Sequence, residues 1–202
     1  RRLTAAQRAY VGTLVAYQKL RDGDPAAARQ QFTDLGYVRT WRVLGPFDNE
    51  GKAGFDRATP AEEHLDQPSD PNGEWPGRER PVHWRPYPDV APLGYVSLDA
   101  VFRPNENTCA VAETFVNVAR ARTLSVWAGG GGAIKVYWNG AQVLRDEKYR
   151  TADPDRDVAL VAAVQGQNRL LVKSCTTSAG WGFYLRLGEA DGGPVQGVTL
   201  DA

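Results

Sequence analysis

The sequence has no methionine, only two cysteines and two histidines, and no net charge. Its 24 basic residues balance its 24 acidic residues, so neither charge is in excess for binding nucleic acid or an anionic membrane. No apolar run approaches the ~20 residues that a membrane-spanning helix needs. With 202 residues, of which 42% are hydrophobic, the chain can form one large domain, or one domain with an appendage. We expect a soluble globular protein with no nucleic-acid partner and no membrane span.

Catalytic motifs are also missing. The two histidines, His64 and His83, lack the neighbours of a metal site or a catalytic triad, and no Gly-x-Ser-x-Gly elbow occurs. Cys109 and Cys175 lie on two segments that are both expected to be strands. A disulfide bridge and two small buried side chains are both consistent with this placement, so the redox compartment stays open. We expect a protein that is not an enzyme.

A helical hairpin is expected at the start of the chain. Thr4 and Gln7 form a capping-box pair, in which each side chain satisfies the other residue's backbone N–H. Gly23 ends the first helical run. Asp24 and Pro25 begin a second one, because a capping side chain followed by proline suits the first turn of a helix. Apolar residues of the first run form one stripe at helical spacing: Tyr10, Leu14 and Tyr17.

The turn between these helices, with the sequence GDPAAA at 23–28, resembles the junction between helices of tetratricopeptide arrays. A single pair cannot bury both of its faces, since such repeats need about three to be stable. One interpretation makes residues 1–37 the end of a helical array in a longer chain, whose adjacent domains are then partners. The other makes them a hairpin that docks on the domain that follows.

Short alternating segments replace the helical period from Val38 onward. At least eight of them show the apolar and polar alternation of half-buried strands, with no helical pattern between them. Asn139-Gly140, between two such segments, is a strong hairpin signal because both residues tolerate positive φ. Strands and polar turns without crossover helices predict a mainly β protein, an antiparallel β-sandwich or jelly roll over residues 38–202. A long, irregular, acidic loop is expected at 45–81.

Several ordered motifs resemble those of galactose-binding-domain-like β-sandwiches, the fold of many carbohydrate-binding modules. They are WRVLGPFDNEG at 41–51 with GFD at 54–56, VYWNG at 136–140, GQNRLLVK at 166–173 and GWGFYLR at 180–186. Modules of this kind are attached to bacterial glycoside hydrolases, esterases and multidomain surface proteins. The resemblance implies a galactose-binding-like jelly roll, and the preceding helix pair is similar to repeats that precede such a sandwich in large bacterial envelope proteins.

The resemblance implies recognition, although this fold serves sugar binders, peptide binders and spacers alike. We expect a non-catalytic module of a larger bacterial protein that binds a glycan or a cell-envelope polymer. It would act outside the cytoplasm, in the periplasm or at the cell surface. The alternative is a structural or protein-protein interaction module with no small-molecule ligand.

Exposed aromatic rings form platforms on which sugar rings stack, and large exposed aromatics are otherwise uncommon. The candidate ligand contacts lie in expected loops or at a strand entry: Trp75, Trp84, Tyr87, Arg85 and Trp181. Trp75 and Trp84 fit equally well as plugs packed under the loops. Tryptophans in alternating segments are expected in the core: Trp41, Trp127 and Trp138. An exposed Trp75 or Trp84 would favour glycan binding, whereas buried tryptophans beside an uncovered helix stripe would favour the alternative.

The segment from Asp48 to Glu74 holds eight acidic residues and two basic ones. Calcium prefers hard oxygen ligands on flexible backbone, so Asp48, Asn49 and Asp56 are candidate ligands for a structural calcium ion. Galactose-binding-like sandwiches often carry such an ion. An acidic solvated loop is the alternative, because no EF-hand spacing is present. A second alternation of carboxylates, at 153–157, resembles a short calcium loop, but the proline at its second position and the absent Gly and Glu favour a turn before the next strand.

Overall fold

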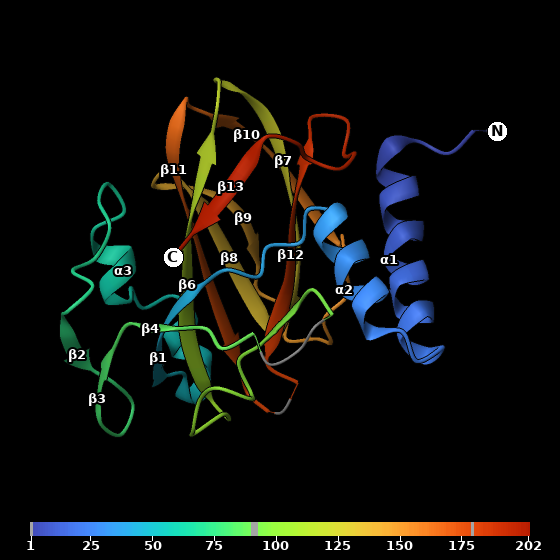
Figure 1. The fold of residues 1–202 in the computed structure, drawn as a ribbon. Coiled ribbons are helices and arrows are strands. Elements are labelled where there is room, and N and C mark those ends of the chain that lie inside the picture. The colour runs from blue at the N-terminus through green and yellow to red at the C-terminus, as the bar shows by residue number, and fades with distance from the viewer. Residues whose placement is uncertain (1, 90–92, 179) are drawn as a thin grey trace.

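The computed structural model describes residues 2–89, 93–178 and 180–202. Two antiparallel β-sheets pack face to face, with a pair of helices outside one sheet and a segment of short elements outside the other (Figure 1). This confirms the prediction of a mainly β protein, an antiparallel sandwich with an N-terminal helix pair. Within the described ranges, no helix is long and apolar enough to cross a membrane.

The larger sheet has seven strands and the smaller sheet has four. Six strands of the larger sheet follow the order β4-β1-β6-β11-β8-β9, and β13 pairs with the part of β6 that lies beyond β1. Their bounds are β1 Arg42–Asp48, β4 Arg85–Pro86, β6 Thr108–Val118, β8 Ala133–Trp138, β9 Ala141–Asp146, β11 Gly166–Thr176 and β13 Val198–Asp201. The smaller sheet has the order β10-β7-β12-β5, formed by β5 Tyr95–Ser97, β7 Arg122–Gly131, β10 Asp157–Ala163 and β12 Gly182–Glu189.

Alternation along the strands divides their side chains between the core and the outer face of each sheet. In the central strands β6 and β11, the even-numbered apolar residues join the core between the sheets, and odd-numbered residues face outward. Buried members of this core include Val43, Ala112, Val116, Val126, Leu170, Val172, Phe183 and Leu185. Trp41 and Trp138 belong to it, as expected. Trp127 instead lies on the outer face of β7 and is partly exposed.

The two helices form as predicted. α1 spans Ala5–Arg21 and begins with the capping box of Thr4 and Gln7. α2 spans Pro25–Asp34 and is capped by the side chain of Asp24, which accepts a hydrogen bond from a backbone N–H at 2.9 Å. In Figure 1, α2 lies between α1 and the strands of the smaller sheet.

An aromatic cluster joins the helix pair to the smaller sheet. Phe32 of α2 is fully buried, with the rings of Tyr17 and Tyr37 edge-on to it at 5.4 and 5.1 Å. The hydroxyl of Tyr17 is hydrogen-bonded to that of Tyr184 on β12. The hairpin therefore docks on the sandwich, and its continuation into a helical array stays a prediction.

Residues 49–84 lie against the outer face of the larger sheet, and we call this segment the insert. It contains the 3-10 helix η1 Glu50–Phe55, the helix α3 Pro60–Glu63 and the hairpin of β2 Glu74–Pro76 with β3 Pro81–His83. An apolar cluster joins it to the sheet: Leu44, Ala61, Val82, Trp84, Val111, Tyr137 and Leu171. Much of the expected acidic loop is thus built from short elements with a buried apolar side.

Candidate binding cleft

A row of charged side chains lies on the outer face of the larger sheet, beneath the insert. Glu113 of β6 is fully buried and forms ion pairs with Arg169 of β11 and Arg42 of β1. Arg169 also donates hydrogen bonds to the backbone carbonyls of His64 and Gln67 in the insert, at 3.1 and 2.9 Å. Buried charges are tolerated when they are paired and hydrogen-bonded, so this network fixes the insert against the sheet.

A second buried ion pair holds α3 in place. Glu62 accepts hydrogen bonds from the ammonium of Lys173 at 2.9 Å and from the hydroxyl of Tyr137 at 2.7 Å. Lys173 is fully buried and also donates to the carbonyl of Arg57 at 2.6 Å. Burial raises the pKa of Glu62, but the charge of Lys173 and the hydrogen bonds it accepts outweigh burial, so its pKa is lowered. Burial lowers the pKa of Lys173, and Glu62 opposes that change.

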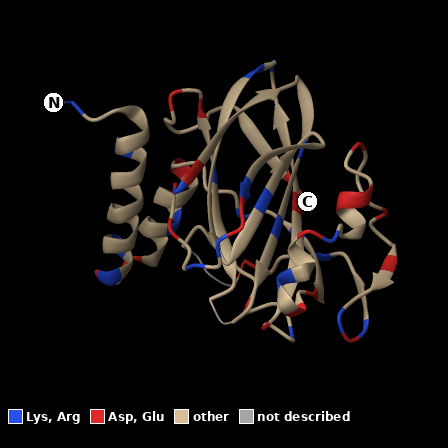
Figure 2. Cartoon of the chain, turned by 180° about the vertical axis from the view of Figure 1, so that it is seen from behind, with Lys and Arg blue, Asp and Glu red and all other residues tan. Residues whose placement is uncertain are grey.

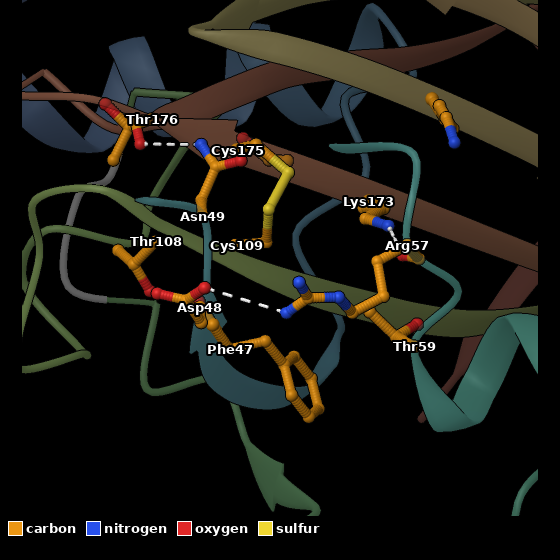
Figure 3. The surroundings of a disulfide bond; sticks show 12 residues. Phe47, Asp48, Asn49, Arg57, Thr59, Thr108, Cys109, Lys173, Cys175 and Thr176 are labelled. Atoms are coloured by element: carbon orange, nitrogen blue, oxygen red, sulfur yellow. Dashed lines mark hydrogen bonds and ion pairs between the residues drawn. A yellow bond between two sulfur atoms is a disulfide. The ribbon is translucent and has the colours of Figure 1, made fainter. Parts of the chain in front are cut away.

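Cys109 and Cys175 form a disulfide between paired positions of β6 and β11, which decides between the two alternatives left by the sequence. Figure 3 shows Asp48 and Asn49 beside this bond, with their side chains making different contacts. Asn49 is fully buried and donates its amide to a β11 carbonyl at 3.0 Å. Asp48 instead faces the guanidinium of Arg57 at 3.6 Å.

Two hollows that share lining residues lie along the insert, and together we call them the Trp75 cleft. Their volumes are about 270 and 390 Å³, and Pro76 and Gly77 line both of them. The first hollow is also lined by Phe47, Asp48, Gly54, Arg57, Ala58, Thr59, Pro60 and Glu63. The second is also lined by Glu74, Trp75, Arg78, Glu79, Arg80 and Pro81. Clefts of this size, with aromatic and polar walls, are suited to small ligands or to a few units of a polymer.

Trp75 is the aromatic wall of the second hollow. It lies on β2 opposite Val82 of β3, and its side chain is partly exposed. The ring lies against Gly73, where a Cβ atom would approach a ring carbon to 2.4 Å, so glycine is needed for this contact. The ring also packs against the apolar cluster of the insert, which limits its positions. A ring held in place loses little freedom when a ligand stacks on it.

Charged groups of both signs line the first hollow and its border with the second. Asp48 lies 3.6 Å from Arg57 and 3.9 Å from Arg78, and Arg78 lies 3.7 Å from Glu50. The side chains of Arg57 and Asp48 are 64% and 39% exposed, so a ligand can reach both. Hydroxyl groups donate and accept hydrogen bonds, and this mixture of donors and acceptors suits them.

The other four predicted ligand contacts are buried or engaged elsewhere. Trp181 is fully buried and donates its indole N–H to a β11 carbonyl at 3.2 Å. Tyr87 is 7% exposed, and its hydroxyl accepts a hydrogen bond from a backbone N–H of β5. Trp84 is also 7% exposed and lies under the guanidinium of Arg42. Arg85 stacks on a core phenylalanine, 4.6 Å from the ring centre. Ligand contact by these residues stays a prediction, and Trp75 is the predicted aromatic that lines the cleft.

The predicted calcium ligands each contact protein groups. Asp48 faces two arginines, and Asn49 is buried and hydrogen-bonded to backbone. Asp56 accepts a hydrogen bond from Arg145 at 2.8 Å, and this bond lowers the pKa of Asp56. Among the residues that the structure describes, no three His, Cys, Asp or Glu side chains gather as a metal site does. A structural calcium ion at these positions stays a prediction.

Sequence reasoning missed the side chains that complete the first hollow, Arg57 and Glu63. One signal for them was present, because Thr59-Pro60-Ala61-Glu62 has the capping-box spacing that starts a helix. A helix start at Thr59 places Glu62 and Glu63 on different sides of the first turn. Here Glu62 contacts the sheet and Glu63 lines the hollow.

No family model matches the chain, and no curated protein matches it. Among solved structures, it is similar to a β-glucosidase from Kluyveromyces marxianus at 10% identity and a TM-score of 0.46, covering 74% of this chain and 16% of that one. It is also similar to a family 35 carbohydrate binding module from an environmental isolate, at 15% identity and a TM-score of 0.31, covering 47% and 71%. A CBM35 from Paenibacillus barcinonensis matches at 20% identity and a TM-score of 0.27, covering 54% and 78%.

The structural neighbours thus include carbohydrate-binding modules, at low similarity. The chain spans 34% of another neighbour, an anti-sigma factor domain-containing protein, at a TM-score of 0.39. These likenesses are too distant to assign a family or a ligand.

Proposed function

We propose that this chain is a non-catalytic recognition module that binds a glycan or a cell-envelope polymer in the Trp75 cleft. The observation that carries the proposal is the partly exposed ring of Trp75, held against Gly73 beside a hollow with accessible Asp48 and Arg57 side chains. An aromatic face with hydrogen-bonding groups of both kinds is what a pyranose ring requires, because one side of the ring is apolar and its edge carries hydroxyls.

The proposal places the module outside the cytoplasm. Its support is the disulfide between Cys109 and Cys175, because disulfides persist in oxidising compartments. A calcium ion is a further part of the proposal. If it binds at Asp48, Asn49 and Asp56, calcium raises the melting temperature and a chelator lowers it, since a ligand of the folded state stabilises that state.

A glycan array followed by titration calorimetry tests the proposal. For a glycan that binds saturably, Trp75→Ala should weaken the binding free energy by about 1–3 kcal/mol, which is the contribution of a desolvated aromatic anchor. Trp127→Ala is the matched control, because Trp127 is also partly exposed but lies on the smaller sheet, away from the cleft. Equal losses in the two variants, or no saturable glycan, would contradict the proposal. Unchanged glycan chain length after incubation would support a non-catalytic role.

The alternative is a structural or protein-protein interaction module without a small-molecule ligand. Two observations favour it. Trp84 and Trp181 are buried, and two of the three residues of the predicted helix stripe, Tyr10 and Leu14, are 39% and 53% exposed, while the third, Tyr17, packs on Phe32. Both functions can reside in one chain, because the β2–β3 hairpin, whose residues line the cleft, and α1, which carries the stripe, lie on opposite sides of the sandwich (Figure 1).

A further inference from the structure

The first helix carries its small and large side chains in an unusual arrangement. Its buried positions are the small residues Ala9, Thr13 and Ala16, which are at most 1% exposed. Gly12 also faces the hairpin partner, because a Cβ there would come within 2.9 Å of Leu35. Four large apolar side chains face solvent, since Tyr10, Val11, Leu14 and Val15 are 39–53% exposed, whereas Tyr17 packs on Phe32. α1 thus lies close to the protein while leaving its bulkier apolar side uncovered.

The exposed residues have the spacing of a helix-packing surface. Tyr10 with Leu14, and Val11 with Val15, form two adjacent ridges of residues four positions apart. Such ridges fit into the grooves between side chains of another helix. Scattered apolar residues on a surface need no explanation, but two complete ridges side by side form a continuous patch.

A groove continues this patch toward the smaller sheet. It has a volume of about 340 Å³ and lies between the first turns of α1 and the Trp127 side chain on β7; Asp155 also lines it, with its charge paired to the buried Arg186. The Trp127 indole N–H is already hydrogen-bonded to Ser125 at 2.9 Å, so the ring offers apolar surface to the groove. We call the whole area the α1 surface; it consists of Leu3, Tyr10, Val11, Leu14, Val15 and Trp127.

The sheet extends this surface beyond Trp127. Val158 on the edge strand β10 pairs directly with Trp127, so both side chains are on the same outer face. Val158 and Leu160 are 47% and 63% exposed. The apolar area therefore runs from one side of α1 across to the edge of the smaller sheet.

The charges on α1 indicate what kind of partner fits. The helix contains Arg8, Lys19 and Arg21 and no acidic residue. In Figure 2, α1 is tan and blue along its length, and red appears only beyond its end. Among the described residues, neither Arg8 nor Arg21 forms an ion pair within the chain, and both are exposed. A second copy packed helix to helix would bring these positive charges near one another, whereas acidic side chains complement them.

We infer that the α1 surface docks an amphipathic helix of a partner protein, whose apolar ridge lies along Tyr10, Val11, Leu14 and Val15 and whose flanks carry Asp or Glu beside Arg8 and Arg21. This interaction goes beyond glycan recognition and does not depend on it.

Two synthetic helical peptides of about 18 residues test this inference. Both have leucines at alternating three- and four-residue spacing; one has glutamates on its flanks and the other has lysines in their place. Fluorescence anisotropy with the whole chain should show saturable binding of the glutamate peptide, about tenfold tighter than that of the lysine peptide. Leu14→Gln should weaken this binding about tenfold while keeping the helix propensity of the site. Arg8→Glu with Arg21→Glu should reverse the preference between the peptides.

Val164→Gln is the control, because Val164 is 52% exposed but lies beyond the end of β10, outside the α1 surface. The inference is overturned if the glutamate peptide does not bind, if both peptides bind equally, or if Leu14→Gln has no effect. It is also overturned if Leu14→Gln abolishes a dimer in sedimentation, which would make a second copy the occupant. Binding to vesicles of anionic phospholipid that depends on Leu14 would also overturn it, because the partner of the α1 surface would then be a lipid surface and not a helix. Trp75→Ala leaves peptide binding unchanged, so the outcome is independent of the glycan test.

Discussion

The helix pair and the insert each cover the outer face of one sheet, but with different side chains. α1 and α2 pack with small residues and a cluster of aromatic rings. Among the described residues, their polar contacts outside the hairpin are made by hydroxyls and by one ion pair, Arg29–Asp89 at 3.6 Å, in which Arg29 is half exposed and which contributes little. The insert combines an apolar cluster with two buried sets of ion pairs, around Glu113 and around Glu62. One layer is positioned by shape and the other also by charge.

This difference determines how each layer responds to a substitution. Apolar packing tolerates small changes, because its energy is spread over many contacts. Removing the partner of a buried charge is strongly destabilising, since the desolvation cost of that charge is no longer offset. The insert should therefore be the more sensitive layer, and the Trp75 cleft that it forms should be lost with it.

The largest expected effect is that of Glu113→Gln. The change removes the buried negative charge and leaves Arg42 and Arg169 without a counterion, so the free energy of unfolding should fall by about 3–5 kcal/mol. Urea unfolding measures this loss. Glu63→Gln, at an exposed position of the same layer, is the control and should change stability by less than about 0.5 kcal/mol. A loss below about 1 kcal/mol in Glu113→Gln would show that charge does not hold the insert.

The next largest effect is expected on acidification, which should destabilise the insert at a higher pH than the helix pair. The folded-state pKa of Glu62 is lowered from its ordinary value of 4.5, so the unfolded chain takes up this proton first as the pH falls. The stability contributed by the pair with Lys173 is therefore fully present above the ordinary value and is lost as the pH falls through the folded-state pKa. The helix pair contacts the sheet through tyrosine and threonine hydroxyls, and its ion pair with a carboxylate, Arg29–Asp89 at 3.6 Å, is partly exposed and therefore weak.

Hydrogen exchange, corrected for the intrinsic pH dependence of amides, checks this order. Amides of α3 and β2 should lose protection at a higher pH than those of α2 when the protein is acidified. Simultaneous loss in both layers would mean that the chain unfolds as one unit and that Glu62 makes no separate contribution.

The helix pair could be predicted from the sequence because its signals are local. Thr4, Gln7, Asp24 and Pro25 act within one turn of helix, so their roles do not depend on the rest of the fold. Strand alternation likewise predicted the sandwich. Alternation does not say which face of a strand meets the core. The segment of Trp127 alternates as predicted, but Trp127 itself lies on the outer face of the sheet and not in the core.

The insert and the cleft could be predicted only in part. The acidic residues of the segment suggested a solvated loop, yet Glu62 is buried because Lys173 lies opposite it on β11. The two residues are far apart in the sequence, and alternation alone places Lys173 on a face expected to contact water. The burial of Trp84 likewise depends on residues distant in the sequence, because Arg42 lies over its ring and Val111 and Leu171 belong to the same apolar cluster. Trp75 packs only in part on the same apolar cluster, and its ring lies against Gly73, two positions earlier in the sequence.

The smallest expected effects come from two substitutions within α1, which compare its buried side with its exposed side. Ala16→Leu places a large side chain at a fully buried position, so overpacking should lower the free energy of unfolding by about 1–3 kcal/mol. Leu14→Gln changes the exposed side and should alter stability by less than about 0.5 kcal/mol. Thermal and urea unfolding of the isolated chain measure both. A loss of more than about 1 kcal/mol for Leu14→Gln would mean that Leu14 already contributes to the folded state. The α1 surface would then be part of this protein's own packing, and its large side chains would not be free for a partner.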